Sequence, residues 1–236
     1  MKYLKKFNTH SDYETFTGST DFILPNVSYC VNEDEVHFNQ IADTHEYVDL
    51  GLPSGTLWAT DIIRNENGEP LYFAWGETQG YTSGQVGTDK NFIWKDYKYG
   101  NGTSTPGATG MTKYNSTDAK TVLDAEDDAA TINWGSSWKM PSKEQFDELD
   151  SNTVKEITES GIVLTSSING NSLIIKGYGY ANDGTYHGGS NMIHNWTSSL
   201  YTEDVRKGYR YIFQNSAFTN GNRTRYVGSP VIPVKS

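Results

Sequence analysis

Two histidines and two serines are the side chains whose types could supply a base and a nucleophile. His187 and His194 precede Ser198 and Ser199 by a short stretch of chain. The Gly-x-Ser-x-Gly turn that presents a serine nucleophile in many hydrolases is missing. A zinc site would need a third ligand at a suitable spacing from the two histidines, and the sequence offers none. The pattern therefore predicts no catalytic residues and a protein that is not an enzyme.

An acidic run and a single cysteine are the remaining candidates for metal chemistry. Glu126, Asp127 and Asp128 could form a metal cluster, but adjacent helical residues point in different directions, which favours solvated charges in a first helical turn. Cys30 is the only cysteine, so an internal disulfide framework and a four-cysteine zinc site are excluded. Glycine motifs for phosphates or dinucleotides are also absent. We expect no metal and no cofactor.

The charge of the chain restricts its partners. The 236 residues carry a formal net charge of −10, and the pI is about 4.9. An acidic surface disfavours nucleic acid and anionic membranes, because both bind to positive surfaces. No stretch approaches the roughly 18 apolar residues that span a bilayer, and no apolar signal-peptide segment follows Met1. We expect no nucleic acid partner, no membrane insertion and no signal peptide in this chain.

The stretch 133–149 is the predicted centre of the hydrophobic core. Trp134 and Trp138 bracket a Gly-Ser-Ser bend, and large indoles contribute strongly to any core that they enter. Ser142, followed three residues later by Gln145, forms a capping box, which predicts the start of a helix. We interpret these residues as a bend packed into the hydrophobic core, with no catalytic or ligand-binding role.

Two main helices are predicted. The helix that begins after Ser142 carries Phe146 and Leu149 on one face. Another is predicted over 124–134, where Asp124 would be the N-cap and acidic residues would crowd the positive end of the helix dipole.

Short strands and long loops make up the rest of the prediction. Turn-forming residues separate apolar or alternating runs along the chain. The predicted strands cover residues 47–52, 57–59, 71–78, 161–165, 172–178, 208–213 and 231–234. Asn169-Gly170 gives the strongest hairpin signal. Residues 79–118 are predicted to form a folded loop held by aromatic side chains, namely Phe92, Trp94, Tyr97 and Tyr99.

Residues 1–46 are predicted to form a small separate module. Residues 27–31 and 36–38 form a hairpin by pattern, with an acidic turn between them. A unit of this size is marginal alone, so we expect it to dock onto the main domain or a partner. Its Pro-Asn-Val-Ser-Tyr-Cys core, which ends at Cys30, resembles N-terminal segments of structural proteins from phages of gut Bacteroidetes. The resemblance implies an anchoring module.

Residues 47–236 carry an ordered set of motifs. They are Asp-Leu-Gly-Leu-Pro-Ser-Gly-Thr-Leu-Trp-Ala from Asp49, Phe-Ala-Trp-Gly-Glu-Thr from Phe73, Leu-Asp-Ala-Glu-Asp-Asp-Ala-Ala from Leu123, Asn-Trp-Gly-Ser-Ser-Trp-Lys-Met-Pro-Ser from Asn133, Trp-Thr-Ser-Ser from Trp196, and Arg-x-x-Gly-x-x-Val-Ile-Pro-Val from Arg225. The set resembles the Fibrobacter major paralogous domain type, which is similar to the formylglycine-generating-enzyme branch of the C-type lectin fold. The resemblance implies an α+β fold of C-type lectin type, with short antiparallel strands, two main helices and long loops. Ile232 departs from the arginine that many relatives carry, which puts a buried ion pair there in doubt.

The same fold and closing motif mark variable proteins of diversity-generating retroelements. The resemblance therefore implies a binding face built from residues 178–226, in which adenine-directed mutagenesis changes Asn codons while the scaffold stays fixed. In the strand 209–213, alternation places Tyr209, Tyr211 and Phe213 on the core face. Arg210 and Ile212 are then expected on an exposed contact face, and Trp196 is assigned to the core.

The candidate ligand-binding residues have the composition of an antibody paratope, in which aromatic side chains give contact area and small polar ones adapt. They are Tyr180, Asn182, Tyr186, His187, Asn191, His194, Asn195, Tyr201, Arg206, Arg210, Ile212, Asn215, Phe218, Asn220, Asn222 and Arg223. An ordinary glycine-rich polar loop surface is the alternative interpretation. The calcium loops of sugar-binding C-type lectins and the cysteine pair of the oxidase branch are both missing.

The combined hypothesis is a non-enzymatic receptor-binding protein on a phage virion. Its diversified C-terminal surface would bind a host surface glycan or protein. The N-terminal module would attach it to other virion proteins, and we expect a homo-oligomer. The alternative is a Bacteroidetes cell-surface protein with a fixed ligand.

Overall fold

The chain divides into two units, Met1–His45 and Glu46–Ser236. The computed structural model describes the backbone of residues 27–32, 35–40, 45–159, 161–189, 192–214 and 217–235. It also describes the side chains of these residues, except those within 27–40 and 214–220. In the first unit, β1 (Val27–Asn32) pairs antiparallel with β2 (Glu35–Gln40), which confirms the predicted hairpin. The rest of the predicted N-terminal module lies outside the described residues.

The two ends of the second unit meet in one sheet. β3 (Tyr47–Asp49) pairs with β4 (Leu57–Ala59), and β4 pairs with the C-terminal strand β13 (Val234–Lys235). Val234 lies opposite Trp58, whose side chain is fully buried. The last described residues therefore complete a sheet that the first residues of the unit begin.

A three-stranded meander follows the second helix. It consists of β5 (Thr153–Thr158), β6 (Gly161–Ser166) and β7 (Ser172–Ile175), all antiparallel. The β6–β7 turn contains Asn169-Gly170, as predicted, and Gly170 has a φ of +81°, which glycine adopts without strain.

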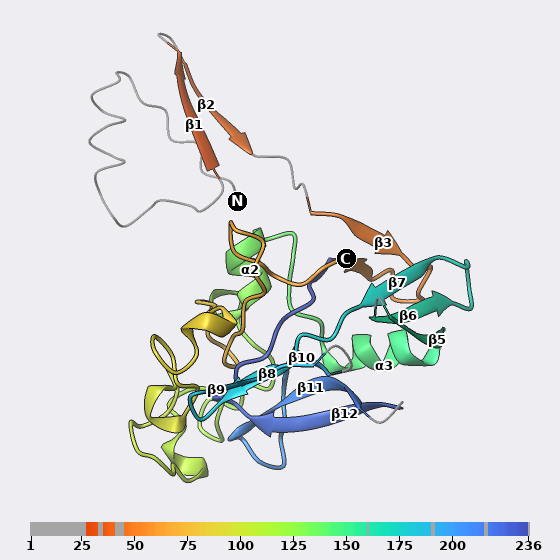
Figure 1. Cartoon of the computed structure of the whole chain (residues 1–236). Coiled ribbons are helices and arrows are strands. Elements are labelled where there is room, and N and C mark those ends of the chain that lie inside the picture. Colours follow the sequence, from red (N-terminus) through yellow and green to blue (C-terminus); the bar gives the residue numbers. More distant parts are fainter. Residues whose placement is uncertain are drawn as a thin grey trace. The chain divides into compact units, whose positions relative to one another are not determined.

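The C-terminal half of the unit contains a ribbon and a sheet. β8 (Tyr180–Asn182) and β9 (Thr185–His187) form the ribbon. The sheet has the order β10 (Ile193–Leu200), β11 (Lys207–Gln214) and β12 (Ala217–Thr224). Figure 1 shows α3 (Lys143–Ser151) next to this sheet, and the ring of Phe146 stacks on Tyr211 at 4.3 Å.

The predicted capping box is confirmed. Ser142 accepts a hydrogen bond from the backbone N–H of Gln145, and the Gln145 side chain accepts one from the N–H of Ser142. The ring of Trp138 is buried and meets Trp134 edge to face at 5.1 Å. The predicted bend is thus part of the core, together with Phe146 on α3.

The other predicted helix is shorter and begins later. Residues Ala125–Asp127 form a single 3₁₀ turn, and α2 covers only Ala129–Trp134. Asp128, not Asp124, is the N-cap of α2, because its carboxylate accepts the N–H of Thr131 while its own backbone is extended. The extended backbone at Asp128 interrupts what the acidic pattern suggested was one continuous helix.

Aromatic side chains hold the long loop, as predicted. Phe92, Tyr97 and Tyr99 are buried, and the half-buried Trp94 meets Tyr226 at 4.9 Å. Three 3₁₀ turns lie within this loop at Ser83–Gln85, Trp94–Asp96 and Ala108–Gly110.

Four strand predictions were too long. β3 ends at Asp49 rather than at residue 52, and β7 ends at Ile175 rather than at residue 178. In the stretch 71–78 only Tyr72 and Phe73 make isolated bridges, to Tyr81 and Ser229. At the C-terminus only Val234 of the predicted strand is in β13. Most residues of 71–78 and 231–234 are buried without forming regular strands, so their apolar composition reflects burial in the core.

The predicted α+β class with two main helices is wrong. In the described residues, α2 and α3 have six and nine residues, while most regular structure lies in antiparallel sheets of two or three strands. The second unit is therefore β-rich, and the expected C-type lectin architecture is corrected accordingly. The apolar periodicity of residues 124–149 indicated helices without fixing their length.

Candidate functional site

The register of the C-terminal sheet sorts the candidate residues onto two faces. Opposite residues of antiparallel strands share a face. His194 lies opposite Ile212, and Arg210 lies opposite Gly221, two residues before Arg223. His194, Arg210, Ile212 and Arg223 therefore share one face.

The other face packs against α3. Tyr211 and Phe213 are buried there, as predicted, whereas Tyr209 is only half-buried. Asn195 lies opposite Tyr211 and is also buried, so the candidate set includes a residue on the face that packs against α3. Asn222, opposite Tyr209, is half-buried on the same face.

The prediction of an exposed Arg210 is wrong. Arg210 is only 5% exposed and His194 only 3%, while Ile212 is half-buried over Gly221. Tyr180 of β8 covers them: its ring centroid lies 5.6 Å from the Arg210 guanidinium carbon and 4.8 Å from the His194 ring. The ribbon buries a face that strand alternation alone left open.

Four side chains converge on the Tyr180 ring, and together with it they form what we call the Tyr180 cluster: Tyr180, His187, His194, Arg210 and Arg223. His187 stacks on the tyrosine at 4.7 Å, and the Arg223 guanidinium carbon lies 5.5 Å from the same centroid. Tyr180, His187 and Arg223 are half-buried, so the cluster reaches the surface. Figure 1 shows the β8–β9 ribbon alongside β10–β12, the elements that bring these residues together.

The Tyr180 cluster contains polar atoms that lack partners. Both ring nitrogens of His194, and Nε and Nη1 of Arg210, are buried without a hydrogen bond to any residue that the structure describes. Buried polar groups are normally hydrogen-bonded, and an orphaned one costs about 1–3 kcal/mol. Outside the cluster, Oδ1 of Asn182 is also buried without a hydrogen bond to any described residue.

Burial and nearby positive charge lower the pKa values of two residues in the cluster, His194 and Arg210. Burial, with smaller contributions from Arg210 and Arg223, lowers the pKa of His194 to about 3. Burial and the nearby Arg223 lower the pKa of Arg210 to about 9. His194 is therefore neutral at pH 7, and no carboxylate is among the groups that shift the pKa of Arg210.

The serine–histidine pairing weighed above is not formed in the described structure. Ser198 Oγ donates to the carbonyl oxygen of Pro141 at 3.4 Å, and Ser199 Oγ accepts from the Lys143 N–H at 3.1 Å. The His194 ring has no partner, so no base contacts either hydroxyl. His187 and His194 also do not belong to any group of three metal-ligating side chains in the part of the chain that is described.

The acidic cluster consists of Asp124, Glu126 and Asp127, whose carboxylate oxygens lie within 4.8 Å of one another. Lys113 Nζ lies between them at 2.8, 2.8 and 2.5 Å. The prediction of solvated charges is wrong for Asp127, which is buried. Asp128 instead caps α2.

Asp127 is held as a charged group. Its carboxylate accepts hydrogen bonds from Lys113, Tyr99, Tyr114 and Lys98. Burial opposes ionisation, but these hydrogen bonds outweigh it and keep the pKa of Asp127 well below its usual range. The cluster already contains its own cation, and we interpret it as structural.

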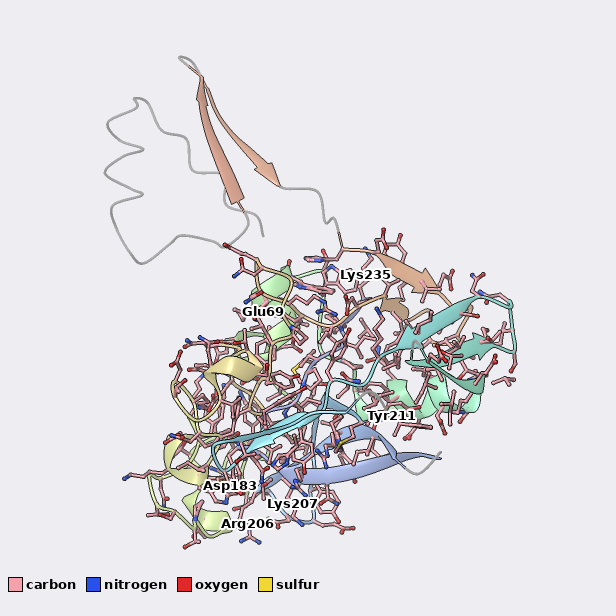
Figure 2. All side chains as sticks on the ribbon, in the orientation of Figure 1. Glu69, Asp183, Arg206, Lys207, Tyr211 and Lys235 are labelled. Carbon is pink, nitrogen blue, oxygen red and sulfur yellow. The ribbon has the colours of Figure 1, made fainter. Side chains whose placement is uncertain are left out.

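Several other candidates lie away from the Tyr180 cluster. Tyr186 is exposed and contacts the Tyr72 ring at 5.4 Å. Tyr201 donates to Glu203, and Arg206 pairs with Asp204 at 2.8 Å. Figure 2 labels Arg206 next to Lys207, its neighbour in the chain, and apart from Tyr211.

The remaining predicted residues are only partly described. Asn182 donates to Asp183 at 2.8 Å. Asn191 and Asn215 lie outside the described residues, while Phe218 and Asn220 belong to β12 by their backbone alone. Trp196 is confirmed as a core residue, since its fully buried indole donates to the Phe73 carbonyl at 2.8 Å.

Arg225 is a key residue that the candidate set did not include. It is fully buried, and its guanidinium donates to Tyr97 Oη at 2.8 Å and to the carbonyl oxygens of Val205 and Lys113 at 2.8 and 2.9 Å. Arg225 begins the motif Arg-x-x-Gly-x-x-Val-Ile-Pro-Val, and this motif was the sequence signal that could have identified it. Its role is to join the long loop to the end of β12.

Comparison with protein-family models, curated proteins and solved structures gave no match. The family resemblance therefore depends on the sequence motifs alone. No helix in the described parts of the chain combines the length and hydropathy of a membrane span.

Proposed function

We propose that the protein is a non-enzymatic ligand-display protein whose surface within residues 178–226 binds host surface molecules. The observation that carries this proposal is the Tyr180 cluster: buried polar atoms without partners next to half-exposed aromatic and charged side chains. Polar groups left unsatisfied in this way are expected at functional sites, because a ligand can supply the missing partners. The free energy that these unsatisfied groups cost the folded protein is then recovered when the ligand binds.

The proposal includes diversification by a retroelement. Scaffold residues such as Trp196, Tyr211 and Phe213 are buried, whereas Tyr180, Ile212 and Arg223 are half-buried. Half-exposed positions on a packed sheet accept substitution at small cost, since surface changes usually alter stability by less than about 0.5 kcal/mol. This separation of fixed and changeable positions supports a diversified face.

The same proposal places the protein on a phage virion. The β1–β2 hairpin would attach it to other virion proteins, because an isolated two-stranded hairpin is marginally stable and gains from a partner. A homo-oligomer would present several copies of the binding face. The net charge of −10 supports a glycan or protein ligand over nucleic acid.

Deep sequencing of the gene in a natural population tests the proposal. We expect adenine-derived substitutions confined to codons 178–226 that spare Trp196, Phe213, Gly228 and Pro233. Asn codons mutated in this way reach Tyr, His, Arg, Phe and Ile but not Lys, Glu, Gln, Met or Trp. Substitutions spread evenly along the chain would overturn diversification and favour a cell-surface protein of Bacteroidetes with a fixed ligand.

A further inference from the structure

We propose that the Tyr180 cluster binds an oxyanion of the ligand, a carboxylate, sulfate or phosphate group, through Arg210 and Arg223. The inference rests on the proposed function and narrows the ligand class at that site. The two guanidinium groups lie on the same face of neighbouring strands and within 5.6 and 5.5 Å of one tyrosine ring. Planar guanidinium forks match the oxygen geometry of these anions.

The hydrogen-bond inventory of the cluster fits an anion. Arg210 has buried donors at Nε and Nη1 without acceptors, and His194 can donate from either ring nitrogen. Arginine has no acceptor atom, so only an acceptor-rich ligand can satisfy this residue. A neutral hydroxyl would satisfy one donor and leave the charge of Arg210 uncompensated.

The charge of the surrounding sequence fits as well. From residue 205 onward the chain contains the basic residues Arg206, Lys207, Arg210, Arg223, Arg225 and Lys235, and it contains no Asp or Glu. The protein as a whole has a net charge of −10, so this end is opposite in sign to the rest. Of these basic residues, Arg210 and Arg223 belong to the Tyr180 cluster, and their positive charge attracts anions even on an acidic protein.

Arg64, Arg206 and Arg225 all have hydrogen-bond or ion-pair partners within the protein. Arg64 pairs with Asp61 and Arg206 with Asp204, both at 2.8 Å. Arg225 is satisfied by oxygen atoms of the protein. Arg210 and Arg223 are different, because no residue that the structure describes accepts a hydrogen bond from them.

An approach to Arg210 exists through its neighbours. Arg223 and Tyr180 are half-buried, and the Tyr180 ring lies 5.6 Å from the buried Arg210 and 5.5 Å from Arg223. An anion would meet Arg223 first, and small rotations of the two side chains would bring it to Arg210. Bound negative charge would also offset the repulsion between the two arginines, and it would raise the pKa of His194 from about 3.

Titration of the full-length protein with defined probes tests the inference. The probes are glucuronate, inorganic sulfate and inorganic phosphate, with glucose as the neutral match, at constant ionic strength. Binding is measured from the NMR signals of the His194 ring and the arginine side chains. We expect saturable binding of at least one oxyanion and none of glucose. Which probe binds tightest identifies the group as carboxylate, sulfate or phosphate.

The double variant Arg210→Met, Arg223→Met is expected to weaken binding at least tenfold while remaining folded. Arg64→Gln is the matched control, because Arg64 also lies over a tyrosine ring, at 5.1 Å from Tyr178, but already has a carboxylate partner. It should bind the probes as the unmodified protein does. Saturation by none of the oxyanions, or equal affinity in the double variant, would overturn the inference.

Binding of the labelled protein to a panel of gut Bacteroidetes isolates separates this inference from the proposed function. Cell binding that the tightest oxyanion probe competes away supports both. Cell binding that no oxyanion reduces overturns the inference and leaves the proposed function standing. Oxyanion binding in solution without binding to any isolate supports the inference and counts against the proposed function.

Discussion

Arg225 and Arg210 are both buried, yet their surroundings are opposite. Arg225 donates to Tyr97 Oη and to the carbonyl oxygens of Val205 and Lys113, and it contacts four aromatic rings. Arg210 has no acceptor among the described residues and contacts one ring. The guanidinium of Arg225 is hydrogen-bonded within the fold, whereas that of Arg210 has buried donors that no described residue satisfies.

The difference separates a structural group from a functional one. A buried charge with complete hydrogen bonding rigidifies its surroundings, whereas a buried charge without partners lowers stability. Natural proteins tolerate the second arrangement mainly where function requires it. Burial alone therefore does not distinguish the two arginines, but their hydrogen bonds do.

The largest effect is expected for Arg225→Met. The substitution leaves the buried oxygens around Tyr97 and Val205 without donors, so we expect the free energy of unfolding to fall by at least about 3 kcal/mol. Urea denaturation measures it. Arg206→Gln, which breaks only the partly exposed pair with Asp204, should cost less than about 1 kcal/mol. Similar losses for the two variants would contradict the role given to Arg225.

Arg210→Met should act in the opposite direction. Methionine fills a similar space without a charge that needs solvation, so the free energy of unfolding should rise by about 1–4 kcal/mol. The same urea experiment measures it. A loss of stability would mean that Arg210 has a structural partner, and the comparison with Arg225 would fail.

A smaller effect is expected from the pH dependence of stability. The pKa of His194 is about 3 in the folded protein and near 6.5 in the unfolded chain, so the unfolded state binds more protons between these values. Stability from this group is complete above pH 6.5 and declines as the pH falls. Its loss between pH 7 and pH 5 should be roughly 2 kcal/mol.

His194→Gln checks that assignment. The variant should lose this part of the decline, measured as the difference between urea unfolding curves at pH 7 and pH 5. An unchanged slope in the variant would show that another group titrates, and that His194 is not held neutral by the cluster.

Local sequence signals predicted local structure well. The capping box at Ser142 and the Asn169-Gly170 turn depend on neighbours within a few residues, so their chemistry is visible in the sequence. Burial of Trp196 was also predictable, since tryptophan side chains are highly buried on average.

Features set by distant contacts were not predictable. Alternation placed Arg210 on an open face, but the Tyr180 ribbon from another part of the chain covers it. The acidic residues from Asp124 to Asp127 suggested a solvated helix start, but Lys113 and two tyrosines from the long loop gather around Asp127. All five members of the Tyr180 cluster were among the candidate residues, but only as part of a larger set, and the sequence could not show that the other four surround Tyr180.

The strand β13 has a consequence for how the gene tolerates mutagenesis. Its residues, Val234 and Lys235, are translated after the whole segment 178–226, yet they close the sheet that Tyr47 and Trp58 begin. A frameshift or stop codon within the segment removes this strand and leaves Trp58 without its neighbour. The closing strand therefore works as a test of reading frame: a chain completes this sheet only after residues 178–226 have been translated in frame.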